Sequence, residues 1–239
     1  MKIAVLFTPL GLSAPELAGR GVVVIDVLRA ATTVITALAN GAKAIVPAAT
    51  SEEAVRLTAN LEKDGLLLAG ERKCLKIEGF ALGNSPREMT PEVVSGKTIF
   101  LATTNGTPAL VAAQGGDPVM VGGAVNFKAL VERARAVFAE RGDLVIVCAG
   151  REREFALEDA YTAGRLVRAL KRGSRKLRLN DAATAAVDLT THYDDWAGAL
   201  SHCEAARQLA EVDLGADVAF SAKPDRFTVV PTYADRRIT

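Results

Sequence analysis

The chain has 239 residues, of which 49% are hydrophobic and 24% charged, a composition typical of globular proteins. Lys and Arg number 29 against 28 Asp and Glu, so the net charge of +1 provides no overall field to attract nucleic acid or an acidic membrane. The three cysteines form no Cys-x-x-Cys pattern, and no apolar run is long enough for a signal sequence or a membrane span. We therefore expect a cytoplasmic protein with neither a nucleic-acid nor a membrane partner.

The first quarter of the chain alternates between strand and helix patterns. Apolar runs at residues 3–7 and 22–25 predict strands, and the unbroken β-branched residues of the second indicate burial on both faces. Residues 30–39 have a helical pattern that ends at an Asn-Gly capping signal. A short strand at 44–47 precedes a helix at 51–61.

A long segment without a regular pattern interrupts this alternation. It covers residues 70–86, follows a strand at 66–69, and is rich in Gly, Asn and Pro. Irregular segments of this length inside a compact domain are usually functional. The pattern then predicts strands at 98–102 and 119–121, a helix at 108–113 with Pro at its first position, and an amphipathic helix at 124–140.

The remaining chain contains a strand at 144–147, helices at 157–171, 181–189 and 197–209, and late strands at 218–220 and 227–230. A basic segment at 171–176 is expected to be a solvated connector. We expect one α/β domain over residues 1–239, within which a helical subregion could begin at about residue 174.

Polar clusters follow four of the predicted strands. They are Asp26 with Arg29; Glu71 with Arg72; residues 103–107; and residues 148–150, with Glu158 and Asp159 shortly after. If these strands are parallel, all four clusters lie at the edge of the sheet where open α/β folds bind ligands. This convergence predicts an enzyme that acts on a small anion.

Asp26 directly follows a buried strand, so its carboxylate is expected to project into the crevice. Such a position suits a Mg²⁺ ligand or a nucleophile, whereas the alternative is a cap for the next helix. Arg29 and the hydroxyls of Thr32 and Thr33 lie within one turn and could donate to phosphate, which favours the functional interpretation.

The loop Thr104-Asn105-Gly106-Thr107 joins a strand to a helix. Asn-Gly can adopt left-handed dihedrals that turn successive N–H groups inward to form an anion-binding nest, although an ordinary turn fits equally well. The chain has neither a Walker loop nor a Gly-x-Gly-x-x-Gly motif, so no nucleotide cofactor is supported.

The other candidates each have a structural alternative. Glu71 could be a second metal ligand and Arg72 a clamp for an anion, or the two could form a surface ion pair. Glu158 and Asp159 could complete a metal site, but acids in a first helical turn are also expected from the helix dipole. Cys148 suits core packing as well as chemistry, and two histidines are too few for a histidine metal cluster.

Five motifs in this order resemble the 2-phosphosulfolactate phosphatase family over nearly the whole chain. They are residues 24–30 (VIDVLRA), 70–72 (GER), 79–86 (GF and GNSP), 103–107 (TTNGT), and 148–150 (CAG) with 157–159 (LED). The resemblance implies a Mg²⁺-dependent phosphatase that converts 2-phospho-3-sulfolactate to sulfolactate, a step towards coenzyme M. It also implies a layered α/β/α fold with a largely parallel or mixed central sheet and a topology of the family's own, not assumed to be Rossmann-like.

These observations together give an assignment of roles. Asp26 and Glu71 bind Mg²⁺, Arg29 and residues 104–107 hold the phosphate of a small anionic substrate, and Arg72 meets its carboxylate or sulfonate. Glu158 or Asp159 is the general-base candidate. Further candidates for substrate binding are Thr32, Asn84 and Ser85.

Two positions depart from the family pattern. Ala81 stands where the family usually has an acid, and Lys73-Cys74 stands where glycines are usual. If the missing acid served the chemistry, activity or substrate would differ from the family's. A non-catalytic anion sensor and a phosphotransferase acting on a small acceptor therefore stay open as alternatives, as does a homo-oligomeric state.

Overall fold

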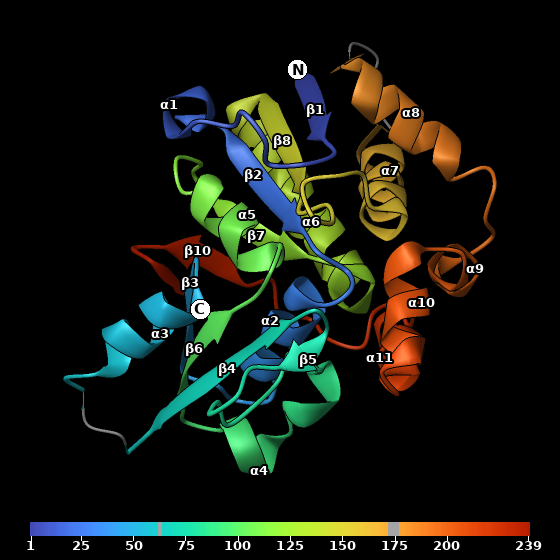
Figure 1. Cartoon of the computed structure of the whole chain (residues 1–239). Coiled ribbons are helices and arrows are strands. Elements are labelled where there is room, and N and C mark those ends of the chain that lie inside the picture. The colour runs from blue at the N-terminus through green and yellow to red at the C-terminus, as the bar shows by residue number, and fades with distance from the viewer. Residues whose placement is uncertain (62–63, 172–176) are drawn as a thin grey trace.

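The computed structural model describes residues 1–61, 64–171 and 177–239 (Figure 1). In this part of the chain eleven strands form one sheet in the order β5-β4-β6-β3-β11-β10-β7-β2-β8-β1-β9. The strands are β1 (Lys2–Leu6), β2 (Gly21–Ile25), β3 (Ala44–Ala48), β4 (Leu66–Arg72), β5 (Leu75–Lys76), β6 (Thr98–Ala102), β7 (Val119–Gly122), β8 (Asp143–Cys148), β9 (Arg178–Leu179), β10 (Thr232–Ala234) and β11 (Arg237–Ile238).

Helices are packed on both faces of this sheet. They are α1 (Ala14–Leu17), α2 (Ala30–Ala39), α3 (Ser51–Thr58), α4 (Pro91–Val94), α5 (Gly106–Ala112), α6 (Phe127–Arg141), α7 (Leu157–Lys171), α8 (Asp181–Leu189), α9 (Trp196–Ser201), α10 (Glu204–Glu211) and α11 (Gly215–Ser221), with short 3₁₀ helices η1 (Pro86–Glu88) and η2 (Ala124–Asn126). No helix in the described part of the chain is long and apolar enough to cross a membrane.

The sequence of β2 explains why helices cover both faces. Successive strand residues point to opposite faces, and all five residues of β2 are buried. Val22 and Val24 belong to an apolar core with residues of α2 and α5, whereas Val23 and Ile25 belong to a second core with residues of α6 and α7. The expected layered α/β/α fold is confirmed.

The sheet is not uniformly parallel. β4, β6 and β3 form one parallel block, and β7, β2, β8, β1 and β9 form another. Between the blocks, β10 and β11 form three successive antiparallel pairings, so the two blocks run in opposite senses along the sheet. Figure 1 shows β2 and β4 pointing towards the middle of the molecule from opposite sides. The expectation of a single parallel edge is therefore corrected: the four polar clusters come from two blocks whose carboxyl ends face each other.

Most predicted elements are confirmed, and α7 and α8 have the bounds expected from the sequence. The helix expected from residue 108 begins two residues earlier, and the first turn of the helix expected from residue 124 is 3₁₀. Gly142 ends α6 in the left-handed region, with φ 73°. The basic segment at 172–176 lies outside the described residues.

Three predictions for the carboxyl-terminal part were wrong. Residues 218–220 belong to helix α11, because a short apolar run does not distinguish a strand from a buried helix. Residues 227–230 are not a strand, because the Asn126 side-chain amide donates a hydrogen bond to the Val229 carbonyl. The next strand, β10, begins after Pro231. The helix expected over 197–209 is divided into α9 and α10, where the side chains of Ser201 and His202 bond the Gly198 carbonyl.

Candidate active site

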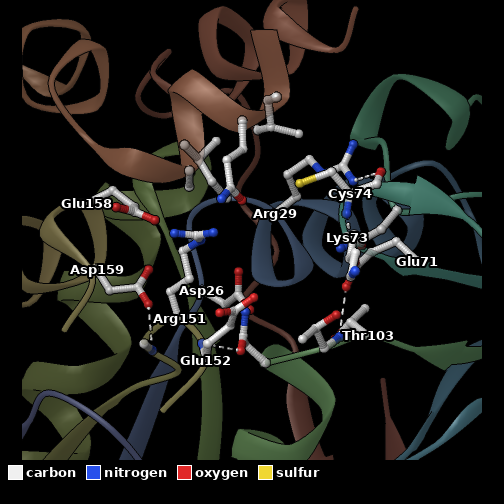
Figure 2. A pocket seen from close by; sticks show the side chains of 18 of the residues that line it. Asp26, Arg29, Glu71, Lys73, Cys74, Thr103, Arg151, Glu152, Glu158 and Asp159 are labelled. Atoms are coloured by element: carbon white, nitrogen blue, oxygen red, sulfur yellow. Dashed lines mark hydrogen bonds between the residues drawn. The ribbon is translucent and has the colours of Figure 1, made fainter. Parts of the chain in front are cut away.

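The loops that follow β2, β4, β6 and β8 meet around a cavity of about 260 Å³ (Figure 2). Residues from α10 line it as well, so the carboxyl-terminal helices complete the enclosure. The charged residues on its wall are Asp26, Arg29, Glu71, Arg72, Lys73, Arg151, Glu152, Glu158 and Asp159. The structure therefore brings together clusters that are far apart in the sequence.

Asp26 lies at the centre of this arrangement. One of its carboxylate oxygens, Oδ1, accepts a hydrogen bond of 3.0 Å from the backbone N–H of Ala30, so the capping alternative is realised at the start of α2. The other oxygen lies close to Gly106, where a Cβ atom would approach Oδ2 to 2.5 Å. Only glycine lets the loop after β6 lie this close to Asp26. The residue thus caps a helix and lines the cavity at the same time.

Burial dominates the protonation of the carboxyl groups on this wall. The pKa of Asp26 is raised to about 7: burial is the main cause and the neighbouring Glu158 and Glu71 act in the same direction, whereas the Ala30 N–H and Arg29 lower this pKa. Burial also raises the pKa of Glu158, and it raises that of Asp159 well above its usual range. Burial therefore favours the neutral, protonated form of these three carboxyl groups.

These raised pKa values predict an unusual dependence of stability on pH. A carboxyl group whose pKa is raised in the folded state binds a proton that the unfolded chain has lost, so stability falls as pH rises from about 4 to about 7. In a metal-free buffer with chelator, we expect the melting temperature at about pH 8 to lie below that at about pH 5. Differential scanning calorimetry of wild type and Asp26→Asn measures this.

The substitution Asp26→Asn should make the decline shallower, because it removes one of the titrating groups. Glu158 and Asp159 continue to titrate in the same direction, so part of the slope should persist. An identical slope in wild type and variant would show that Asp26 ionises at its ordinary pKa.

Two of the carboxylates on the wall, Asp159 and Glu71, hold loops together. Asp159 accepts hydrogen bonds from the N–H groups of Val27, at 2.9 Å, and Gly150, at 3.2 Å, which ties the loop after β2 to the loop after β8. Glu71 accepts from the N–H groups of Thr104, at 2.7 Å, and Cys74, at 3.0 Å. Each oxygen of these two carboxylates therefore already has one partner.

The donors fit a Mg²⁺ ion held by few protein ligands. Mg²⁺ prefers carboxylate oxygen and is commonly bound through one or two carboxylates together with water and substrate phosphate. Asp26 offers Oδ2, and each Glu71 oxygen keeps a lone pair beyond its N–H bond. Among the described residues no three His, Cys, Asp or Glu side chains converge closely enough to enclose a metal by themselves. A site completed by the substrate agrees with both observations.

The loop after β6 differs from the expected nest. Asn105 has φ −120°, and Gly106 is needed for space near Asp26 and not for a left-handed dihedral. Thr103 and Thr107 exchange bonds between their hydroxyls and N–H groups at 3.0 Å, and the Thr104 N–H donates to Glu71. Three backbone N–H groups of the loop thus donate to protein side chains and do not point freely into an anion-binding nest.

The other predicted substrate-binding residues occupy different depths. Thr32 and Thr107 are fully buried and do not line the cavity, and the Thr32 hydroxyl donates to the Val27 carbonyl. Asn84 is on the wall, and its buried Oδ1 has no hydrogen-bond partner among the described residues. Ser85 lies behind the wall, where its hydroxyl donates to Asp217. Arg72 is exposed at the rim.

Sequence analysis did not assign Lys73, Arg151 and Glu152 of the wall, or Asp217 behind it, to this site. Arg151 directly follows Gly150, and Figure 2 shows its guanidinium between Glu158 and Asp26. Its position one residue beyond the polar cluster at 148–150 could have identified it from the sequence. Asp217 pairs with Arg29, but it lies in the segment expected to precede a strand, so no signal indicated it.

Ala81 lies outside the cavity. It is exposed and lines a separate apolar hollow beside α3 and β4, together with residues such as Val55 and Leu68. The absence of an acid at this position therefore removes no side chain from the wall of the candidate site.

Comparisons with known proteins identify the family of this chain. The family model described as 2-phosphosulpholactate phosphatase matches residues 7–236. A protein of Clostridium acetobutylicum named "Probable 2-phosphosulfolactate phosphatase" is 35% identical over 238 residues, covering 100% of both chains. Proteins of the same name from Caldanaerobacter subterraneus and Thermotoga petrophila are 40% and 39% identical, covering 90% of this chain and 88% and 90% of theirs. This chain belongs to the 2-phosphosulfolactate phosphatase family, whose members are phosphoric monoester hydrolases.

Proposed function

We propose that the protein hydrolyses the phosphate monoester of 2-phospho-3-sulfolactate, or of a closely related small phosphorylated hydroxy acid, with Mg²⁺ as cofactor. The observation that carries this proposal is the cavity in which carboxylates and arginines from three strand ends converge with the Thr-Asn loop after a fourth, in a chain of this family. Three free cysteines in the described chain suit a reducing compartment, and we place the reaction in the cytoplasm.

Asp26 and Glu71 are the residues that would hold Mg²⁺. When bound, the ion neutralises charge on the phosphate and makes water a better nucleophile. Both carboxylates are buried, so they interact more strongly with a cation than exposed ones would. In this proposal water attacks the phosphorus, so the chain needs no nucleophile of its own. Cys148 is fully buried and absent from the cavity wall, which makes it unsuitable for that role.

Glu158 is the better of the two candidates for general base. Burial raises its pKa above that of an ordinary glutamate, so its carboxylate is a stronger base for taking a proton from water. Asp159 uses both oxygens to hold the loops around Val27 and Gly150. We therefore assign Asp159 the task of placing those loops.

The cations divide into an inner and an outer group. Arg29 and Arg151 belong to the inner wall beside Asp26 and Glu158, where they can donate to phosphate oxygens. Arg72 and Lys73 are exposed at the rim and suit the carboxylate and sulfonate at the far end of the substrate. Leu28, Ala205 and Leu209 contribute apolar wall that limits the entry of water.

The test is release of phosphate from phosphoglycolate and from 2-phospho-3-sulfolactate. We expect turnover with Mg²⁺, loss of turnover in EDTA, and recovery when Mg²⁺ is restored in excess. Calorimetric titration of the metal-free protein with Mg²⁺ would report binding independently of activity. Turnover that is insensitive to EDTA would contradict the metal role and favour a covalent mechanism with Asp26 as nucleophile.

A further inference from the structure

Arg29 is held in the cavity wall by groups from two other parts of the chain. Its Nη1 donates to Oδ2 of Asp217 on α11 at 2.8 Å, and its Nη2 donates to the carbonyl of Cys74 at 2.8 Å. The side chains of the ion pair are 3% and 0% exposed. The other oxygen of Asp217 accepts from the Ser85 hydroxyl at 2.7 Å. Both ends of the pair are therefore fixed.

This arrangement is a costly way to obtain stability. Removing two charges from water carries a large desolvation penalty, and apolar residues of similar volume often stabilise a protein as well as a buried ion pair does. The pair is not remote from the chemistry, because Arg29 lines the cavity and its charge lowers the pKa of Asp26. A guanidinium carries five N–H groups, and the two described bonds leave three.

We propose that Asp217 is a positioning residue for phosphate binding: by pairing with Arg29 it holds the guanidinium so that the remaining N–H groups face the phosphate beside Asp26. The inference rests on the proposed function. It assigns a task to the carboxyl-terminal helix α11, which contributes no residue to the cavity wall. The binding energy of Arg29 then depends on an orientation that α11 imposes.

The same contacts link four segments around the site. Arg29 precedes α2, Cys74 lies between β4 and β5, Ser85 precedes η1, and Asp217 lies in α11. In addition, the Thr33 hydroxyl donates to the carbonyl of Asn84 at 2.8 Å, which fastens the same loop to α2. Asp217 is thus placed to transmit the position of α11 to the phosphate end of the cavity.

The experiment is a double-mutant cycle with Asp217→Asn, Arg29→Gln and the combined variant. The readout is calorimetric affinity for inorganic phosphate in the presence of Mg²⁺, with melting temperature measured alongside. We expect each single variant to bind phosphate about tenfold or more weakly, the loss of one charge-assisted contact, and to melt at a lower temperature. The combined variant is a neutral pair, so it should recover stability relative to the single variants while phosphate binding stays as weak as in Arg29→Gln.

A purely structural role predicts the opposite pattern. If the pair only stabilises the fold, phosphate affinity will recover with melting temperature in the combined variant. Phosphate affinity within about twofold of wild type in Asp217→Asn would also overturn the proposal. The expected loss is about tenfold, which corresponds to about 1.4 kcal/mol. In steady-state kinetics Asp217→Asn should raise KM with little change in kcat, because Arg29 would meet the phosphate in substrate and transition state alike.

Two further variants keep the test decisive. If a single variant does not fold, Ser85→Ala replaces it, because this variant leaves the ion pair intact and removes the hydrogen bond from Ser85 to Asp217. A smaller loss of phosphate affinity is then expected. An unchanged affinity would contradict the proposal. Asp143→Asn is the matched control, because Asp143 pairs with Arg20 at 3.0 Å at the opposite end of β8. It should bind phosphate like wild type. Because phosphate binding is measured directly, absence of turnover in the wild type would refute the phosphatase proposal without deciding the role of Asp217.

Discussion

Asp26→Asn is expected to lower kcat by about a thousandfold or more. Asp26 is a carboxylate that would hold Mg²⁺, and metal chemistry contributes several kcal/mol to catalysis. The amide keeps the shape of the side chain and the hydrogen bond from Ala30, so the fold should be preserved. Steady-state kinetics with saturating Mg²⁺, together with circular dichroism and melting temperature, measures both effects.

The melting temperature of Asp26→Asn distinguishes a loss of catalysis from a loss of folding. Because burial already disfavours the charged form of Asp26, the neutral variant should melt no lower than wild type at about pH 8 in chelator. A folded variant that retains more than about a tenth of the wild-type rate would remove Asp26 from the metal site.

Arg151→Ala is expected to lower kcat/KM by about 10²–10³-fold, the loss typical when one donor to a developing oxyanion is removed. Its guanidinium lies between Glu158 and Asp26 in Figure 2, and its nearest described carboxylate partner, Glu204, is 4.0 Å away. Compared with Arg29, whose terminal nitrogens are both engaged, Arg151 is freer to meet a phosphate oxygen. Kinetics with phosphoglycolate and with 2-phospho-3-sulfolactate should show similar losses, because both substrates carry the phosphate.

Arg153→Ala is the matched control for this variant. Arg153 belongs to the same turn, also has an arginine side chain, but is exposed and does not line the cavity. It should retain wild-type kcat/KM. Equal losses in the two variants would mean that the turn, and not the Arg151 guanidinium, is what catalysis requires, whereas a loss confined to 2-phospho-3-sulfolactate would place Arg151 at the distal anion.

The layered fold and the meeting of the strand ends could be predicted because each rests on a local pattern. Continuous β-branched residues at 22–25 indicate a strand buried on both faces, and polar residues at the end of such a strand can reach only the crevice. Asp26, Arg29, Glu71, Glu158 and Asp159 all line one cavity. The reversal of sense between the two parallel blocks was not predictable, because it depends on a short carboxyl-terminal hairpin that pairs with strands distant in sequence.

The division of labour among the site residues also required the structure. In the sequence, Arg29 is a cation near a strand end, and only the three-dimensional arrangement shows that Asp217 already occupies part of its guanidinium. Likewise the loop at 103–107 has the composition of an anion nest, but its hydroxyls and Glu71 take three of its N–H groups. These are contacts between segments, and local residue preferences do not encode them.

The most direct test of the central proposal is phosphate release from 2-phospho-3-sulfolactate by the purified protein with Mg²⁺, in the absence of any phosphate acceptor. We expect one phosphate and one sulfolactate for each substrate consumed, with the activity abolished in Asp26→Asn. Binding of the substrate without release of phosphate would indicate a sensor, and release that depends on an added acceptor would indicate a phosphotransferase. Either result would contradict the account of this cavity as the active site of a phosphatase.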